Sequence, residues 1–137
     1  MNDATKLRLE ALLATQIAKR ESLGEDLAKW RAEHATALKT IRDADGAYRD
    51  AQATFAKFTR RSYMRVDGER VFYSIELNDL FREDLHQLEL ELQKARASEA
   101  RAQGQLHELD IKIAKCGRDL DELEALLAPA EAAEAAA

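Results

Sequence analysis

The residues with the most obvious chemistry are histidines, one cysteine and the carboxylates near them. Glu83 and His86 form a Glu-x-x-His, the spacing that lets one helix present two metal ligands. Di-iron helical bundles need two such motifs and two further glutamates, and no second copy accompanies His34 or His107. We therefore expect Glu83 and His86 to be exposed helix side chains and predict no metal site.

Cys116 is the only cysteine, which excludes an internal disulfide and suits a reducing compartment. It belongs to a series of mostly apolar residues that are spaced alternately three and four apart, so we expect a buried small apolar residue. Lys115 and Arg118 leave a reactive thiol as the alternative. No nucleophile, base and orienting group can be assembled, and two packed helices offer no enclosed pocket. The sequence therefore predicts a non-enzyme with no catalytic residue and no cofactor.

Composition indicates long helices. The chain has 137 residues, for which one domain over 1–137 is the expectation, and 34% of them are charged, as in coiled coils. No apolar run approaches the roughly 18 residues that span a bilayer, and the N-terminus does not resemble a secretory signal. The net charge of -5 argues against wholesale nucleic-acid binding. We therefore expect a protein without a membrane partner.

Two stretches, 23–58 and 81–127, repeat mostly apolar residues at alternating spacings of three and four. An average spacing of 3.5 is typical of a left-handed coiled coil. We call these the heptad positions, and expect them to lie within arm one, 4–60, and arm two, 75–128. A low-complexity tail, 129–137, follows. The predicted core residues are Leu27, Trp30, Ile41, Tyr48, Phe55, Leu88, Leu92, Leu106, Leu109 and Ile113.

Folding the chain back between the arms brings Phe58 near Phe81 and Trp30 near Leu109. The predicted fold is therefore mainly α: a long antiparallel coiled-coil helical hairpin with a two-stranded β-hairpin at its tip. Residues 43–46, Asp-Ala-Asp-Gly, are the place where we expect the first arm to break, because a glycine costs about 1 kcal/mol relative to alanine inside a helix.

The tip, 62–73, alternates around Asp67-Gly68. Asp-Gly is a strong signal for a two-residue β-turn, because both turn positions need positive φ. Such a turn sets Met64 opposite Val71, and successive side chains of each strand then point to opposite faces of the hairpin. The tip is therefore predicted to be a β-hairpin.

The two faces of this predicted hairpin differ. The inner face is apolar and can cover the ends of the arms; it carries Met64, Val66, Val71 and Tyr73. The outer face has no obvious partner within the chain and carries two aromatic and two basic side chains: Tyr63, Phe72, Arg65 and Arg70. An isolated hairpin is marginal in water, so we interpret the outer face as an interface with copies of this chain or with another protein. The alternative is a flat, merely amphipathic hairpin.

The tip is also basic. Residues 57–70 hold five basic and two acidic side chains, a net charge of +3, which leaves -8 for the remainder. We interpret this charge as contact with an acidic protein surface or with nucleic-acid phosphates, or as a solvated rim. The predicted partner-binding residues are Arg60, Arg61, Tyr63, Arg65, Arg70, Phe72 and Tyr73.

Residues 47–93, a predicted helix followed by a hairpin and a leucine-rich helix, resemble the sequence pattern of a known protein family. Its matching residues are Tyr48, Phe55, Ser62, Tyr63, Gly68, Arg70, Val71, Tyr73, Leu77, Leu80, Leu88 and Leu92. The pattern resembles the gpW family of tailed-phage head–tail adaptors, also called head completion proteins. The helices of that family are only a few turns long, so the family does not account for 1–45 or 95–128.

The resemblance implies a virion protein assembled in the host cytoplasm. Family members bind as a ring beneath the portal after DNA packaging, close to DNA, and form the seat for the next connector or tail protein. The resemblance therefore implies a homo-oligomer in the assembly, with a ring-forming portal or connector protein as its partner. Arg65, Arg70 and Tyr73 would be its contact residues.

Two other classes of protein have a similar predicted architecture of two helical arms. A prefoldin-like chaperone subunit of the bacterial cytoplasm is similar, with coiled-coil arms that end in apolar residues for gripping clients. Such residues are available here in Leu7, Leu9, Leu12 and Leu13. The stalk proteins of type III secretion ATPases are also helical hairpins of about this size. They generally lack a β-hairpin tip, so the Asp67-Gly68 turn counts against that class.

Overall fold

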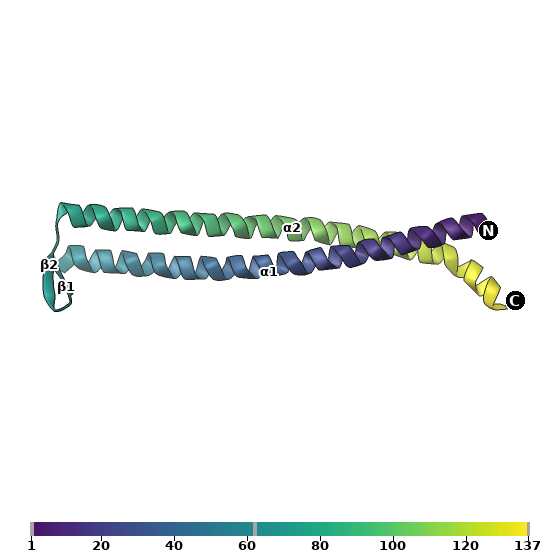
Figure 1. The fold of residues 1–137 in the computed structure, drawn as a ribbon, viewed down its shortest axis with the longest axis horizontal. Helices are drawn as coiled ribbons and strands as arrows, with labels where there is room; N and C mark the ends of the chain where they lie inside the picture. Colours follow the sequence, from purple (N-terminus) through teal and green to yellow (C-terminus); the bar gives the residue numbers. More distant parts are fainter. Residues whose placement is uncertain (1, 62, 137) are drawn as a thin grey trace. The chain divides into compact units, whose positions relative to one another are not determined.

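The computed structural model describes residues 2–61 and 63–136, except the side chains of 130, 131 and 133. Its elements are α1 (Asp3–Arg61), β1 (Tyr63–Val66), β2 (Glu69–Phe72) and α2 (Ile75–Ala136) (Figure 1). The protein is thus mainly helical, with a small antiparallel hairpin between two long helices, as the sequence predicts. Ser62, the first residue of the predicted tip, lies outside the described residues.

Both helices begin at a polar cap. The Thr5 backbone N–H donates to Asn2 Oδ1 at 2.8 Å, and the Leu77 N–H donates to Ser74 Oγ at 3.2 Å. A side-chain oxygen that accepts from the first turn satisfies a backbone donor with no partner inside the helix. Local sequence therefore sets where α1 and α2 start.

The helix break expected at 43–46 is wrong, because α1 runs through it without interruption. Arg49 Nε lies 3.0 Å from Asp45 Oδ2, four residues earlier, and this pair bridges the Gly46 position. Ion pairs at that spacing support a helix. The low helix propensity of one glycine is therefore outweighed by its neighbours.

The end of arm two also differs from the prediction. α2 continues beyond residue 128 to Ala136, with Pro129 inside the helix. Proline removes one backbone donor and disturbs the preceding turn. The residues after it are alanine and glutamate, which are among the strongest helix formers. The low-complexity tail is therefore helical as far as the structure describes it.

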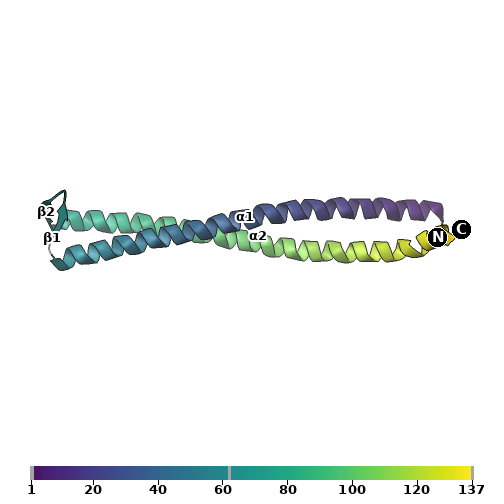
Figure 2. The ribbon, with the colours of Figure 1, turned by 90° about the horizontal axis from the view of Figure 1, so that it is seen from below.

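Residue contacts divide the chain into two units. Unit 1 comprises Met1–Ala32 and Ala102–Ala137, and unit 2 comprises Glu33–Arg101. Within each unit, a segment of α1 runs antiparallel to a segment of α2 (Figures 1 and 2). The hairpin belongs to unit 2, where it joins the two helix segments.

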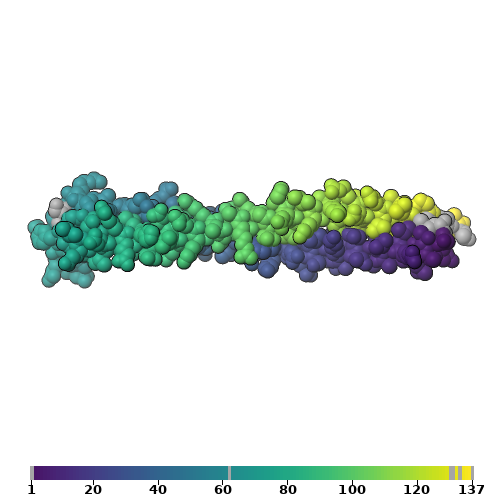
Figure 3. Space-filling view, turned by 90° about the horizontal axis from the view of Figure 1, so that it is seen from above, coloured from purple at the N-terminus to yellow at the C-terminus, as the bar shows by residue number. Residues whose placement is uncertain are grey.

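Unit 1 packs around an aliphatic cluster whose buried members are Leu23, Leu109, Cys116 and Leu120. Trp30 packs against this cluster, which contains its predicted neighbour Leu109. Cys116 is only 1% exposed, and its Sγ lies 3.4 Å from the Gln16 carbonyl oxygen. The prediction of a buried cysteine is confirmed. The purple N-terminal and yellow-green C-terminal segments of this unit lie against each other in Figure 3, and Lys6 forms an ion pair with Glu134.

Unit 2 packs around aromatic rings near the hairpin. Phe58 is 1% exposed, and its ring centroid lies 5.5 Å from that of Phe81. Phe55 also meets Phe81, at 5.4 Å. These are ordinary separations for attractive aromatic pairs. The predicted approach of Phe58 to Phe81, and with it the fold-back of α2 onto α1 in this unit, is confirmed.

The predicted core residues all lie on covered sides of the helices. Leu92 and Leu109 are buried. The other eight are half-buried: Leu27, Trp30, Ile41, Tyr48, Phe55, Leu88, Leu106 and Ile113. The heptad spacing therefore identified which side of each helix is covered, while the coiled-coil supercoil itself stays a prediction.

Candidate protein-binding tip

The hairpin has the predicted register and turn. Met64 pairs with Val71 and Arg65 with Arg70 in an antiparallel ladder. The turn residues have positive φ, 52° at Asp67 and 81° at Gly68. Two consecutive positive φ values are the signature of the type I′ turn, whose twist matches that of paired strands. The prediction that Asp67-Gly68 closes a two-residue hairpin is confirmed.

The inner face of the hairpin packs on the end of α1. Tyr73 presents its ring to that of Phe58, with centroids 5.5 Å apart and planes at 61°. Met64 and Val71 are half-buried, whereas Val66, next to the turn, is 46% exposed. Tyr73 and Met64 therefore lie beside α1, and Val66 is the most exposed of the four predicted inner-face residues. A single buried ring, Phe58, anchors this face.

The outer face combines aromatic rings and arginines. Tyr63 and Phe72 pair across the strands with ring centroids 6.3 Å apart. The guanidinium carbon of Arg70 lies 5.0 Å from the centre of the Tyr63 ring, a cation–π geometry that holds the guanidinium beside the ring. Phe72 is 65% exposed. This face therefore presents a large apolar ring to solvent next to an oriented positive charge.

Arg60 and Arg61 add charge from the last turn of α1, where cations favour the negative end of the helix dipole. Both are exposed, as are Arg65 and Arg70. Within residues 2–61 and 63–136, none of the four arginines forms an ion pair with a carboxylate. The basic charge predicted for the tip is therefore present and unneutralised by contacts within the described chain.

The first turns of α2 expose further apolar side chains that the sequence analysis did not assign to the tip. Ile75 is 80% exposed and Leu80 is 60% exposed. Leu80 lines a hollow of about 350 Å³ together with Leu77, Phe81 and Asp84. The signal was available in the sequence, because Ile75, Leu77 and Leu80 are apolar residues that lie off the heptad positions.

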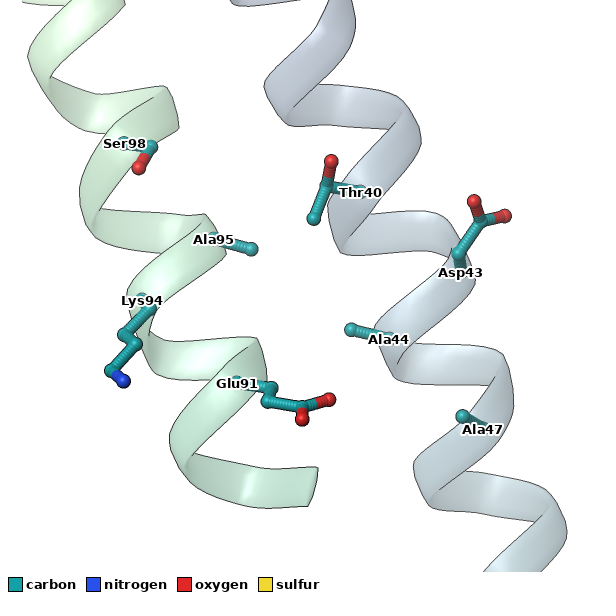
Figure 4. Close-up of a pocket in the computed structure, with 8 residues that line it drawn as sticks. All are labelled: Thr40, Asp43, Ala44, Ala47, Glu91, Lys94, Ala95 and Ser98. Carbon is teal, nitrogen blue, oxygen red and sulfur yellow. The ribbon is translucent and has the colours of Figure 1, made fainter. Parts of the chain in front are cut away.

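A second hollow lies between the helices of unit 2 and measures about 540 Å³. Figure 4 shows Ala44 and Ala95 pointing toward each other across it, while Asp43 and Lys94 point away. Its lining is Thr40, Asp43, Ala44, Ala47, Glu91, Lys94, Ala95 and Ser98. Small side chains opposite one another leave the space open, and the lining supplies no converging ligand set.

The histidines occupy unremarkable positions. His34 Nε2 lies 3.0 Å from Glu99 Oε1, and both side chains are about four-fifths covered, so His34 lies at the edge of the covered side of α1. Glu83 and His86 are exposed, as expected. In the part of the chain that the structure describes, no three His, Cys, Asp or Glu side chains are grouped so that they could hold a metal ion.

Among the described residues, neither helix contains a segment long and apolar enough to cross a membrane. In comparisons with protein-family models, with curated proteins and with solved structures, nothing matches this chain. The resemblance to the gpW adaptors therefore rests on the residues around the hairpin alone.

Proposed function

We propose that this chain is a non-enzymatic assembly protein that docks on a protein ring through the hairpin, as a head–tail connector of a tailed phage does. The observation that supports it is the concentration of exposed large apolar side chains between residues 66 and 80: Val66, Phe72, Tyr73, Ile75 and Leu80. Exposed apolar patches mark interaction sites in soluble proteins, and these five side chains lie within fifteen residues of the chain. We call this group, with the four arginines of the tip, the docking tip.

The composition of the docking tip fits a protein partner. Interface cores are enriched in aromatic residues and arginine and depleted in lysine, and binding energy concentrates in such side chains. Complete burial of a side chain such as Phe72 is favourable by about 1.5–3 kcal/mol. Because 65% of Phe72 is exposed and its ring pairs only with Tyr63 among the described aromatic side chains, a partner gains most of this energy without disturbing the fold.

Two parts of the proposal, a ring-forming partner and a place in the virion, rest on the resemblance of the tip to the gpW family. Tyr63, Gly68, Arg70 and Tyr73 match the family pattern of a hairpin between two helices. On this proposal, several copies of the chain bind side by side on a portal or connector ring in the virion, after assembly in the host cytoplasm. Proximity to packaged DNA is then incidental to the protein contact.

Native mass spectrometry tests the proposal. The chain is mixed with candidate ring proteins encoded by neighbouring genes, and we expect a complex that carries several copies on one ring. Phe72→Asp should abolish the complex, whereas Leu126→Asp should leave it intact. Leu126 is a matched control because it is 53% exposed but belongs to unit 1. A chain that stays monomeric with every ring, or a complex that tolerates Phe72→Asp, rejects the proposal.

A prefoldin-like chaperone is a second candidate because unit 1 also exposes apolar residues. Leu7 is 66% exposed and Leu12 is 52% exposed, and Leu12 lines a hollow of about 320 Å³ with Arg8, Ala11 and Thr15. Client binding through these residues predicts that the chain suppresses aggregation of an unfolded protein. Leu7→Asp with Leu12→Asp should abolish the suppression while Phe72→Asp preserves it.

A further inference from the structure

The outer face of the hairpin places two positive charges directly opposite each other. Arg65 and Arg70 are partners in the strand register, and both are exposed. Like charges directly opposite on neighbouring strands destabilise the pairing. No carboxylate in the described chain forms an ion pair with either guanidinium. The hairpin therefore carries a local electrostatic cost that a bound anion would relieve.

One of these arginines is already oriented. Arg70 lies over the Tyr63 ring at 5.0 Å, and Tyr63 in turn pairs with Phe72 at 6.3 Å. A guanidinium held against a ring loses less rotamer freedom on binding than a free one. Phe72 stands beside it with 65% of its surface exposed. The face thus offers an anion site and an apolar site side by side.

We infer that the outer face of the hairpin (Tyr63, Arg65, Arg70 and Phe72) binds an acidic segment of a protein partner. Carboxylates of the partner pair with the two guanidinium groups, and an apolar side chain of the partner covers the Phe72 ring. Arginine and carboxylate match in planar, two-pronged hydrogen-bond geometry. This inference rests on the proposed docking function and specifies the chemistry of the partner surface.

Charge around the tip favours carboxylates of a protein over a nucleic-acid backbone. Residues 76–91, which follow the hairpin in α2, carry six acidic side chains and one basic one. Glu76 and Asp79, in the first turns of that helix, are exposed. A nucleic acid carries charge along its whole length, so this helix would repel a strand extending past the hairpin. A short acidic segment can bind the arginines and stop there.

The test uses two labelled probes of equal length, a peptide of alternating glutamate and leucine and an oligothymidylate, with binding read by fluorescence anisotropy. The full chain should bind the peptide more tightly than the oligonucleotide. The double variant Arg65→Glu, Arg70→Glu should weaken peptide binding by about tenfold or more, because it removes both charges that pair with carboxylates. Arg82→Glu with Arg96→Glu is the matched control, since both are exposed arginines of α2 in the same unit.

Two results overturn the inference. Tighter binding of the oligothymidylate assigns the face to nucleic acid, and peptide affinity that is equal in the tip and control variants removes the arginines from the site. Helix content measured by circular dichroism shows that each variant is folded.

The ring-binding experiment separates the two proposals. A ring complex lost in Phe72→Asp but kept in Arg65→Glu, Arg70→Glu preserves docking and rejects the acidic partner. Peptide binding that needs both arginines, in a chain that ignores every ring, preserves the acidic-segment site and rejects the ring.

Discussion

The aliphatic cluster of unit 1 and the aromatic hairpin end of unit 2 differ in how much of their large side chains they enclose. The centre of unit 1 is aliphatic, and its cluster around Leu109 and Leu120 is closed to solvent. The hairpin end of unit 2 is aromatic and encloses Phe58, yet it leaves Phe72 and Ile75 largely exposed. Packing alone explains the first arrangement. The second retains apolar surface that the fold does not require, which is why function is assigned there.

Phe58 and Phe72 sharpen the contrast because they are the same residue type within one unit. Phe58 is 1% exposed and contacts two other rings, whereas Phe72 is 65% exposed and meets only the Tyr63 ring among the described aromatic side chains. The first ring supports the tip and the second is available to a partner. Loss of stability and loss of binding should therefore separate between these two positions.

The largest expected effect is at Phe58. Phe58→Ala removes a fully enclosed ring between Phe81 and Tyr73, and substitutions of this kind cost about 3–5 kcal/mol. Urea unfolding followed by circular dichroism measures the change. Phe58→Leu, which retains most of the volume, should cost much less. Equal stability of Phe58→Ala and the unmodified chain would show that the rings near the hairpin do not support the fold.

Features of the fold that depend on local sequence patterns could be predicted, whereas features that depend on packing between elements could not. Heptad spacing identified the covered side of each helix, and Asp67-Gly68 identified the hairpin, because both are local patterns with one dominant structural solution. Ile75 and Leu80 were missed as tip surface, because exposure near a helix start depends on what the hairpin covers. The break expected at Gly46 failed because glycine propensity is weak against a long continuous helix.

Gly68 should give the next largest effect, because its φ of 81° lies where side chains are strained. Gly68→Val places a β-branched residue there at a cost of about 1–3 kcal/mol. We expect ring docking to fall far more than helix content. Gly68→Asn is the control, since asparagine tolerates positive φ. Parallel loss of helix content and docking would mean that the hairpin is not separable from the helices.

The contact between the His34 and Glu99 side chains comes third. His34→Ala leaves a carboxylate that is four-fifths covered without its partner at 3.0 Å, which should cost about 1–2 kcal/mol. Replacing both residues with leucine removes the unpaired charge, so the double variant should be more stable than His34→Ala. Thermal unfolding of the two variants gives the comparison, and a double variant less stable than the single one contradicts the pairing.

A substitution at Gly46 should have a smaller effect, and it should stabilise the protein instead of destabilising it. A Cβ added at this position meets nothing within 4 Å, and the residue lies inside α1. Gly46→Ala should therefore raise the free energy of unfolding by about 0.5–1 kcal/mol through helix propensity alone. Urea unfolding measures it. Destabilisation would show that residues 43–46 need the flexibility that the sequence suggested and the continuous helix does not display.

Phe72 should show the smallest effect on stability and the clearest effect on binding. Its ring pairs only with Tyr63 across the strands, and such exposed cross-strand pairs contribute about 0.5 kcal/mol. Phe72→Ala should therefore unfold in urea almost as the unmodified chain does, while its affinity for the ring or for the acidic peptide falls. A loss of stability close to that of Phe58→Ala would make Phe72 a structural residue. The contrast between an enclosed ring that supports the tip and an exposed ring that binds a partner would then no longer hold.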